Sequence, residues 1–329
     1  MNKYVVITDA AADIPYELFE KGFGVTVIPI KIKMKSDEFL QYPDFRNMSS
    51  KEFYPLVKMG ALPSTVPISK EDYIEVFEEK LKGDNDIIYI GISGGLSDSV
   101  QAATAAAEDM KERYPSSNIS IIDSKNASTG LGLLVTEAIR LKESNTSYEE
   151  AVNILQEKRD RIRNYFFVDD IFHLKRGGLI SKTEPSAAAA LKIRTVFKVD
   201  TDGKLAITTK VRGNPNALEH LSKKVCEEAA IDSYINIAAA NGADRIEKLR
   251  DLLVDGLVSD KEVIDQGLAQ VISVSERINQ RMGTLDIRID KNASISDSVE
   301  QRIMVSEMSL VGGTHSGPGT VAVAFFAKE

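Results

Sequence analysis

The sequence predicts a two-domain α/β protein, with a parallel sheet flanked by helices in the N-terminal domain and a mixed or antiparallel sheet in a C-terminal α+β domain. Three observations lead to this prediction. A chain of 329 residues has the length of roughly two ordinary domains. Strand and helix patterns alternate over the first half, whereas several strand patterns occur without intervening helices in the second half. We therefore expect one domain at residues 1–160 and another at residues 161–329.

The N-terminal half alternates apolar, β-branched runs with amphipathic helical patterns. Strands that alternate with helices of this length form a parallel sheet with helices on both faces. The predicted strands are residues 4–8, 25–34, 86–92 and 118–122, and the predicted helices are residues 14–21, 50–59, 69–81, 98–113, 127–143 and 147–163.

The C-terminal half contains adjacent strand patterns and a strong hairpin signal, Asp202-Gly203. These features favour a mixed or antiparallel sheet. Residues 256–300 fit neither a strand nor a helix pattern clearly, and we interpret them as an insertion. The predicted strands are residues 165–168, 194–199, 204–211, 234–239, 304–310 and 320–327, and the predicted helices are residues 215–230 and 244–254.

Composition and motifs exclude several classes of function. A net charge of −8 without a basic cluster argues against nucleic acid as a partner. No apolar run is long enough for an integral membrane segment, and the chain opens without a signal peptide, so we expect a cytoplasmic protein. The single cysteine, Cys226, cannot form an intramolecular disulfide. Because nucleotide-binding fingerprints and metal-ligand spacings are also missing, we expect no cofactor and no metal.

Short loops rich in small polar residues follow the predicted parallel strands, at the edge where such sheets bind ligands. The loop Ser93-Gly94-Gly95-Leu96-Ser97 is the most informative of them. Its glycines allow close approach of the backbone, and the helix that follows offers N–H groups to an anion such as a carboxylate. The alternative is structural: Ser97 caps the helix and the glycines form a tight turn.

The same loop also fits the pattern G-x-S-x-G of serine hydrolases, between a strand and a helix. In that alternative Ser93 would be the nucleophile, His315 the base, and Asp169 or Asp170 its orienting carboxylate. The pattern is short, and too few strands precede Ser93 for the usual hydrolase fold. We therefore expect no catalysis by the chain itself.

His315 is the histidine with the most informative surroundings. It lies in Gly312-Gly313-Thr314-His315-Ser316-Gly317-Pro318-Gly319, a glycine-rich connection between two apolar strand patterns. Such a loop can bring an imidazole against a ligand, and the alternative is an ordinary wide turn. The basic pair Lys175-Arg176, before two glycines, is equally compatible with the end of a helix and with a ligand or partner contact.

Taken together, these segments resemble the DegV family, which includes the fatty-acid-binding subunits of bacterial fatty acid kinase. The blocks occur in family order along nearly the whole chain. They include Ile7-Thr8-Asp9, Leu62-Pro63-Ser64-Thr65, Ile92-Ser93-Gly94-Gly95-Leu96-Ser97, Ile122-Asp123-Ser124-Lys125-Asn126, Leu174-Lys175-Arg176-Gly177-Gly178, Lys210-Val211-Arg212-Gly213 and Gly313-Thr314-His315-Ser316-Gly317-Pro318-Gly319.

The resemblance implies that one long-chain fatty acid lies in a tunnel between the two domains and that its carboxylate is offered to a kinase subunit. By position, Thr65, Ser93 and the Gly94 backbone would face the carboxylate, Ser97 would cap the helix behind it, and His315 would approach from the second domain. Arg212 would belong to a basic patch that faces the kinase. The sequence departs from the family at Ala10, Ala11, Val66, Gly94 and Leu179, where polar residues are usual. Binding of an unrelated small molecule remains an alternative.

Overall fold

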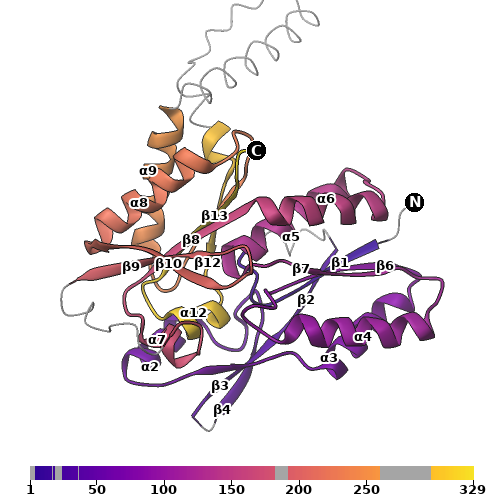
Figure 1. Ribbon diagram of the computed structural model, residues 1–329. Coiled ribbons are helices and arrows are strands. Elements are labelled where there is room, and N and C mark those ends of the chain that lie inside the picture. Colours follow the sequence, from indigo (N-terminus) through magenta and orange to yellow (C-terminus); the bar gives the residue numbers. More distant parts are fainter. Residues whose placement is uncertain (1–3, 17, 19–23, 36, 182–191, 260–297) are drawn as a thin grey trace, which may run out of the picture.

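The computed structural model describes residues 4–16, 18, 24–35, 37–181, 192–259 and 298–329 (Figure 1). Each half of the chain builds its own main sheet, and helix α5 (Ser128–Glu143) lies between the two sheets. A parallel sheet in the first half and a mixed sheet in the second confirm the predicted fold class.

The N-terminal half contains a four-stranded parallel sheet in the order β2-β1-β6-β7. Its two central strands are rich in valine and isoleucine and almost completely buried, because helices cover both faces. Helices α3 and α4 pack on one face, and α5 and α6 on the other (Figure 1). The bounds are β1 Tyr4–Asp9, β2 Val25–Ile28, β6 Asp86–Gly91, β7 Ile119–Asp123, α3 Lys70–Leu81, α4 Ser99–Arg113 and α6 Tyr148–Arg161.

A smaller sheet of three antiparallel strands, in the order β4-β3-β5, adjoins this half. The sequence predicts a single strand over residues 25–34, which is wrong, since Pro29 separates two strands that belong to different sheets. Proline lacks the N–H that a sheet ladder requires, so the pairing changes there. The bounds are β3 Ile30–Met34, β4 Asp37–Gln41, β5 Ser64–Val66 and the neighbouring helix α2 Ser50–Lys58.

The C-terminal half contains a six-stranded sheet in the order β10-β9-β8-β13-β11-β12, in which β11 and β12 pair in parallel and the other neighbours are antiparallel. The predicted hairpin at Asp202-Gly203 joins β9 to β10, and Gly203 has a φ of +73°, where glycine is favoured. Helices α8 and α9 cover one face with a core of their own. The bounds are β8 Ile162–Val168, β9 Ile193–Val199, β10 Leu205–Arg212, β11 Ile235–Ala239, β12 Ile303–Glu307, β13 Val321–Phe326, α7 Phe172–Arg176, α8 Gly213–Glu228 and α9 Ala243–Val258.

Two sequence predictions fall partly or mainly outside the described residues: half of the helix at residues 14–21 and most of the insertion at residues 256–300. The first residues of the predicted insertion extend α9 as far as Val258. Within the described ranges, no helix combines the length and the apolar character that crossing a membrane requires.

Helix α5 joins the two halves because both sheets pack against it. Its sequence allows close approach at Gly132, where a Cβ atom would lie 2.1 Å from the main-chain oxygen of Asp13. The buried Asn236 of β11 adds a polar tie, since its Nδ2 donates to the main-chain oxygens of Asp13 (2.6 Å) and Thr129 (3.0 Å). The two halves therefore share a packed interface.

The glycine-rich connection around His315, which the sequence predicts to be a loop, is a short helix, α12 (Leu310–Ser316). The side chain of Ser309 accepts a hydrogen bond from the Gly312 N–H at 3.4 Å, and Leu310 and Val311 are buried. Two adjacent glycines disfavour a helix in isolation. Packing against α7 and β5 supplies the stabilisation that the local sequence lacks.

Candidate functional site

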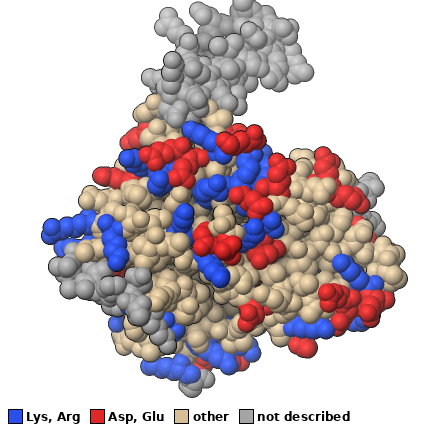
Figure 2. Space-filling view, viewed as in Figure 1, with Lys and Arg blue, Asp and Glu red and all other residues tan. Residues whose placement is uncertain are grey.

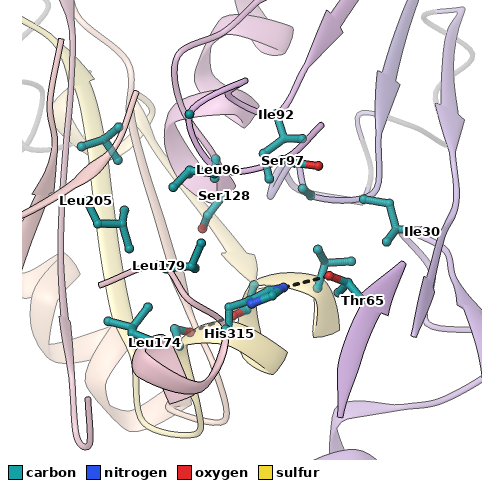
Figure 3. A pocket seen from close by; sticks show the side chains of 18 of the residues that line it. Ile30, Thr65, Ile92, Leu96, Ser97, Ser128, Leu174, Leu179, Leu205 and His315 are labelled. Atoms are coloured by element: carbon teal, nitrogen blue, oxygen red, sulfur yellow. Dashed lines mark hydrogen bonds between the residues drawn. The ribbon is translucent and has the colours of Figure 1, made fainter. Parts of the chain in front are cut away.

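A cavity of about 500 Å³ lies where the two halves of the chain meet (Figure 3). Its wall is mostly apolar, and a volume in this range suits a small molecule or a single acyl chain. Both halves contribute to it. The larger apolar side chains of the wall include Ile30, Ile92, Leu96, Leu174, Leu179 and Leu205.

Two of the predicted site residues, Thr65 and His315, meet on the wall of this cavity although 250 positions separate them in the chain. Thr65 Oγ1 lies 2.9 Å from His315 Nε2 (Figure 3). Strand β5 holds Thr65 by pairing with β3, opposite Ile32, and α12 holds His315. Both side chains are half-buried, and both line the cavity.

The imidazole of His315 is neutral at neutral pH. Burial and then the positive charge of nearby Arg176 lower the pKa of His315 to about 4. A neutral ring has one nitrogen that donates and one that accepts, and the Thr65 hydroxyl can do either. Together they can adapt to a polar head group, and an anionic one would favour the charged form of the ring.

Arg176 lies beside this pair. The sequence leaves open whether this residue only ends a helix or also contacts a ligand or partner. Its Nη1 donates to the main-chain oxygen of Pro63 (2.6 Å), and its Nη2 donates to that of Thr314 (3.1 Å). The two carbonyls belong to the backbone segments that carry Thr65 and His315. The sequence signal for Arg176 is the basic pair Lys175-Arg176 before two glycines. This motif does not show which distant backbone segments the guanidinium contacts.

Ser97 lines the cavity, and its hydroxyl is bonded within its own loop. Its Oγ lies 3.0 Å from Ser99 Oγ and accepts a hydrogen bond from the Ser99 N–H at 3.2 Å. Asp98 precedes α4 as its N-cap residue without a side-chain cap bond. Ser97 therefore satisfies a donor at the start of the helix behind the cavity, although the N-cap position that the sequence predicts for it belongs to Asp98.

Ser93 and Gly94 bind other partners than a ligand in this structure. Ser93 is fully buried, and its Oγ donates to the main-chain oxygen of Gly203 (2.8 Å) and accepts from the Gly95 N–H (3.0 Å). Gly94 borders the cavity, and its N–H donates to Asp123 Oδ2 at 3.2 Å. The carboxylate contacts predicted for Ser93 and for the Gly94 backbone would therefore have to replace these bonds.

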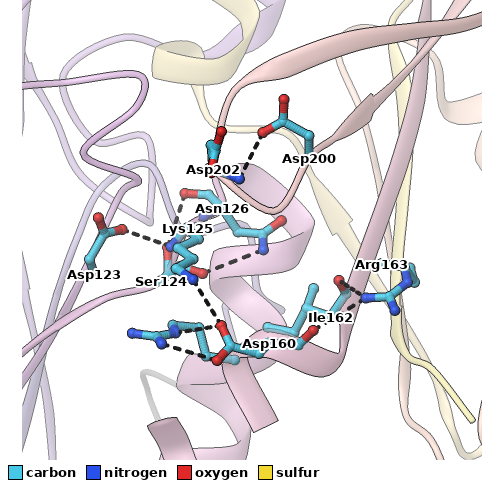
Figure 4. Close-up of polar contacts among 10 residues, drawn as sticks. Asp123, Ser124, Lys125, Asn126, Asp160, Ile162, Arg163, Asp200 and Asp202 are labelled. Carbon is cyan, nitrogen blue, oxygen red and sulfur yellow. Dashed lines mark hydrogen bonds and ion pairs between the residues drawn. The ribbon is translucent and has the colours of Figure 1, made fainter. Parts of the chain in front are cut away.

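Near the Ser93–Gly203 bond, the loop after β7 and the β9–β10 turn lie close together (Figure 4). The loop after β7 places Lys125 so that its N–H donates to Asp123 Oδ1 (2.7 Å) and its Nζ pairs with Asp160 (3.1 Å). The β9–β10 turn, closed by the Asp202 N–H bond to Asp200 Oδ1 (3.0 Å), lies against it. The bond from Ser93 Oγ to the main-chain oxygen of Gly203 ties the loop that the sequence predicts as an anion site to this turn.

The hydrolase alternative gains no support from this geometry. Ser93 Oγ donates to a backbone carbonyl, and His315 Nε2 contacts Thr65. Asp169 pairs with two arginines, and Asp170 accepts a hydrogen bond from a backbone N–H of α7. A nucleophile, base and orienting carboxylate are not linked in the order that acyl transfer requires.

The departures from the DegV pattern make the cavity wall more apolar. Ala11, Val66, Gly94 and Leu179 all line it. Ala10, which precedes Ala11, is buried. Within the described part of the chain, no group of three or more histidine, cysteine, aspartate or glutamate side chains is placed to hold a metal ion. Thr65 and His315 are a pair of lining side chains that contact each other across the two halves. The other polar side chains of the lining are Ser97, Asp98, Ser99, Ser128, Asn164, Ser316 and Thr320.

The chain is similar to known proteins over almost its full length. It is 28% identical over 325 residues to a DegV domain-containing protein of Clostridium perfringens, an alignment that covers 99% of this chain and 98% of the relative. The structure is similar to that of a DegV family protein of Ruminococcus gnavus with vaccenic acid (TM-score 0.76, 17% identity, 98% and 99% of the two chains). It is also similar to the Streptococcus pneumoniae fatty acid kinase B3 protein loaded with linoleic acid (TM-score 0.74, 19% identity, 100% of both chains).

The structural likenesses show a shared fold. The family itself follows from the sequence, since the model of the DegV family of uncharacterised proteins matches residues 3–275, which is most of the chain. This protein belongs to the DegV family.

Proposed function

We propose that this protein binds one long-chain fatty acid in the cavity between its two halves, with the carboxylate at Thr65 and His315. The observation that carries this proposal is one polar pair, with a Thr65 Oγ1–His315 Nε2 distance of 2.9 Å, on the wall of an otherwise mostly apolar cavity of about 500 Å³. The acyl chains in the related Ruminococcus gnavus and Streptococcus pneumoniae structures support it.

The energetics favour a ligand held chiefly by its tail. Each buried CH₂ group contributes about 0.8 kcal/mol, so a chain of some sixteen carbons gains far more from the apolar wall than from its head. A hydrogen bond to a charged group contributes roughly 1.5–3 kcal/mol. Two polar side chains therefore suffice to orient the carboxylate, even with alanine, valine and leucine at the positions where the family usually has polar residues.

We further propose that the chain presents the bound carboxylate to a fatty acid kinase subunit and catalyses nothing itself. Thr65 and His315 are half-buried, so the proposal requires that the head group beside them be within reach of the partner. Lys198, Lys210 and Arg212 are exposed on β9 and β10, and basic side chains gather over these strands in Figure 2. The Streptococcus pneumoniae neighbour, a fatty acid kinase B protein, supports a partner of this class.

Titration of lipid-free protein with palmitate and with methyl palmitate tests the binding proposal. The acid should bind more tightly than the ester because only the acid presents a carboxylate. This difference should shrink in Thr65→Val and in His315→Gln, while the ester binds all three proteins alike. Equal affinity for acid and ester in the wild type would show that the polar pair does not hold a carboxylate.

The kinase proposal has its own test. Palmitate-loaded protein is mixed with ATP and the ATP-binding subunit of a bacterial fatty acid kinase, and acyl phosphate is measured. Product that depends on the loaded protein supports the proposal. Its absence, with tight palmitate binding intact, would leave a fatty acid carrier without this partner.

A further inference from the structure

Helix α12 belongs to the C-terminal half, but both of its ends are attached to the N-terminal half. The N–H of Ser309, immediately before the helix, donates to Asp13 Oδ1 at 2.8 Å. At the other end, His315 Nε2 lies 2.9 Å from Thr65 Oγ1. A helix rises about 1.5 Å per residue, so α12 acts as a short rigid spacer between these two contacts.

Asp13 is itself fixed to the cavity wall. Its Oδ2 accepts a hydrogen bond from the hydroxyl of Ser128, a lining residue, at 2.5 Å. Its N–H donates to the main-chain oxygen of Ser128 (3.3 Å), and its own main-chain oxygen accepts from Asn236 Nδ2 (2.6 Å). A displacement of Asp13 would therefore move the wall as well.

A charge at this place is costly. Asp13 is 3% exposed, and the donors to its carboxyl, the hydroxyls of Ser128 and Ser309 and the Ser309 N–H, are uncharged. Burial raises the pKa of Asp13 to about 6, against the lowering effect of these hydrogen bonds. Burial, followed by the charges of Asp13 and Glu307, also raises the pKa of Tyr54, which packs on α12. Burial therefore opposes ionisation of this carboxyl, and what the geometry gives Asp13 is a set of hydrogen bonds that join the start of α12 to the cavity wall.

We propose that Asp13 is a positioning residue of the ligand site: it fixes the start of α12 against the N-terminal half and thereby keeps His315 within reach of Thr65. Asp13 does not line the cavity and acts through His315. This inference rests on the proposed function, and it adds the residue that holds His315 beside Thr65.

The first test uses ligand-free protein and histidine NMR. In Asp13→Ala the start of α12 is released, so the His315 ring becomes more solvated and its pKa should rise from about 4 toward its ordinary value. Ser128→Ala removes the other bond of the same carboxylate, and Asp13→Asn keeps an oxygen for the Ser309 N–H, so both should retain the wild-type His315 titration. Should Asp13→Ala fail to fold, Ser309→Pro removes the N–H that donates to Asp13, and Ser309 already has a φ of −57°. Because this variant also loses the hydroxyl that caps α12, Ser309→Ala, which keeps the N–H, is its control.

The second test is a double-mutant cycle on palmitate affinity. Asp13→Ala and His315→Gln should each weaken binding by about tenfold, and the double variant should bind no more weakly than His315→Gln alone, because Asp13 acts through His315. An unchanged His315 titration in Asp13→Ala, or an equal loss of affinity with and without His315, would overturn the inference. If the wild type bound no palmitate, the proposed function would fail, while the ligand-free NMR test would still decide the role of Asp13.

Discussion

Replacing His315 with glutamine should make the ligand-free protein less sensitive to acid. The folded-state pKa of about 4 lies below the 6.5 of an unperturbed histidine, which we take for the unfolded chain. As the pH falls below 6.5, the unfolded chain therefore binds a proton that the folded protein still refuses. The stability that neutral His315 contributes is fully present above pH 6.5 and is lost as the pH falls to about 4.

The magnitude follows from the difference of about 2.5 pH units between these values. At 1.36 kcal/mol per unit the full effect is about 3 kcal/mol, and about 2.5 kcal/mol of it should be lost between pH 7.5 and pH 4.5. The partial exposure of the ring makes these figures upper limits. Asp13 acts in the opposite direction, since its raised pKa of about 6 makes the folded state gain stability as the pH falls. This contribution is common to both proteins and cancels in the comparison.

Urea unfolding followed by circular dichroism at pH 7.5 and pH 4.5 measures the effect. The wild type should lose up to about 2.5 kcal/mol more than His315→Gln between the two pH values. The same loss in both proteins would show that His315 is not held neutral, and the assignment of its burial beside Arg176 would be refuted.

Three further predictions concern the same site. Thr65→Val should weaken fatty-acid binding about tenfold or more, because it loses a hydrogen bond to the carboxylate. Ser93→Ala should mainly lower the melting temperature, because its hydroxyl ties the loop to the β9–β10 turn. Calorimetry in which Ser93→Ala lost more affinity than Thr65→Val would contradict this. A bound carboxylate favours the charged form of His315, so binding takes up protons. Fatty-acid affinity should therefore fall as the pH rises between about 4, the pKa of His315 in the free protein, and its higher pKa in the complex. An affinity that does not change with pH in the wild type would exclude this linkage. Gly313→Ala should weaken binding more than Gly312→Ala. The Cβ added at Gly313 would lie 2.2 Å from the hydroxyl of the buried Tyr54, whereas the Cβ added at Gly312 would lie 3.0 Å from the flexible side chain of Met308. Equal affinities of the two variants would mean that the position of α12 does not affect binding.

Much of the architecture could be predicted from sequence because it depends on local patterns. The alternation of β-branched runs and amphipathic helices predicts the parallel sheet, and Asp202-Gly203 predicts the β9–β10 hairpin. The split of residues 25–34 into two strands could not be predicted in the same way, because each part follows a strand pattern. Which sheet each part joins is decided by long-range pairing.

In the site, too, residues with a local sequence signal could be predicted, whereas their long-range partners could not. Thr65 and His315 could be predicted from their loops and from the resemblance to the DegV family, and the structure brings them together. The partners of Ser93 could not be predicted, because its acceptor, the main-chain oxygen of Gly203, lies 110 positions away. Helix α12 could not be predicted either, because its glycines indicate a loop and packing against elements distant in sequence stabilises the helix.

The central claim, an acyl chain in this cavity, is tested most directly by mass spectrometry of lipid extracted from protein purified without detergent. Wild-type protein should release close to one long-chain fatty acid per chain, because a mostly apolar cavity of about 500 Å³ should not remain empty in a cell that contains acyl chains. Leu179→Trp, which places a large ring into the cavity, should release much less, and Leu62→Trp, at a side chain that is 54% exposed, should match the wild type. A wild-type extract without fatty acid, or the same amount from Leu179→Trp, would contradict the account.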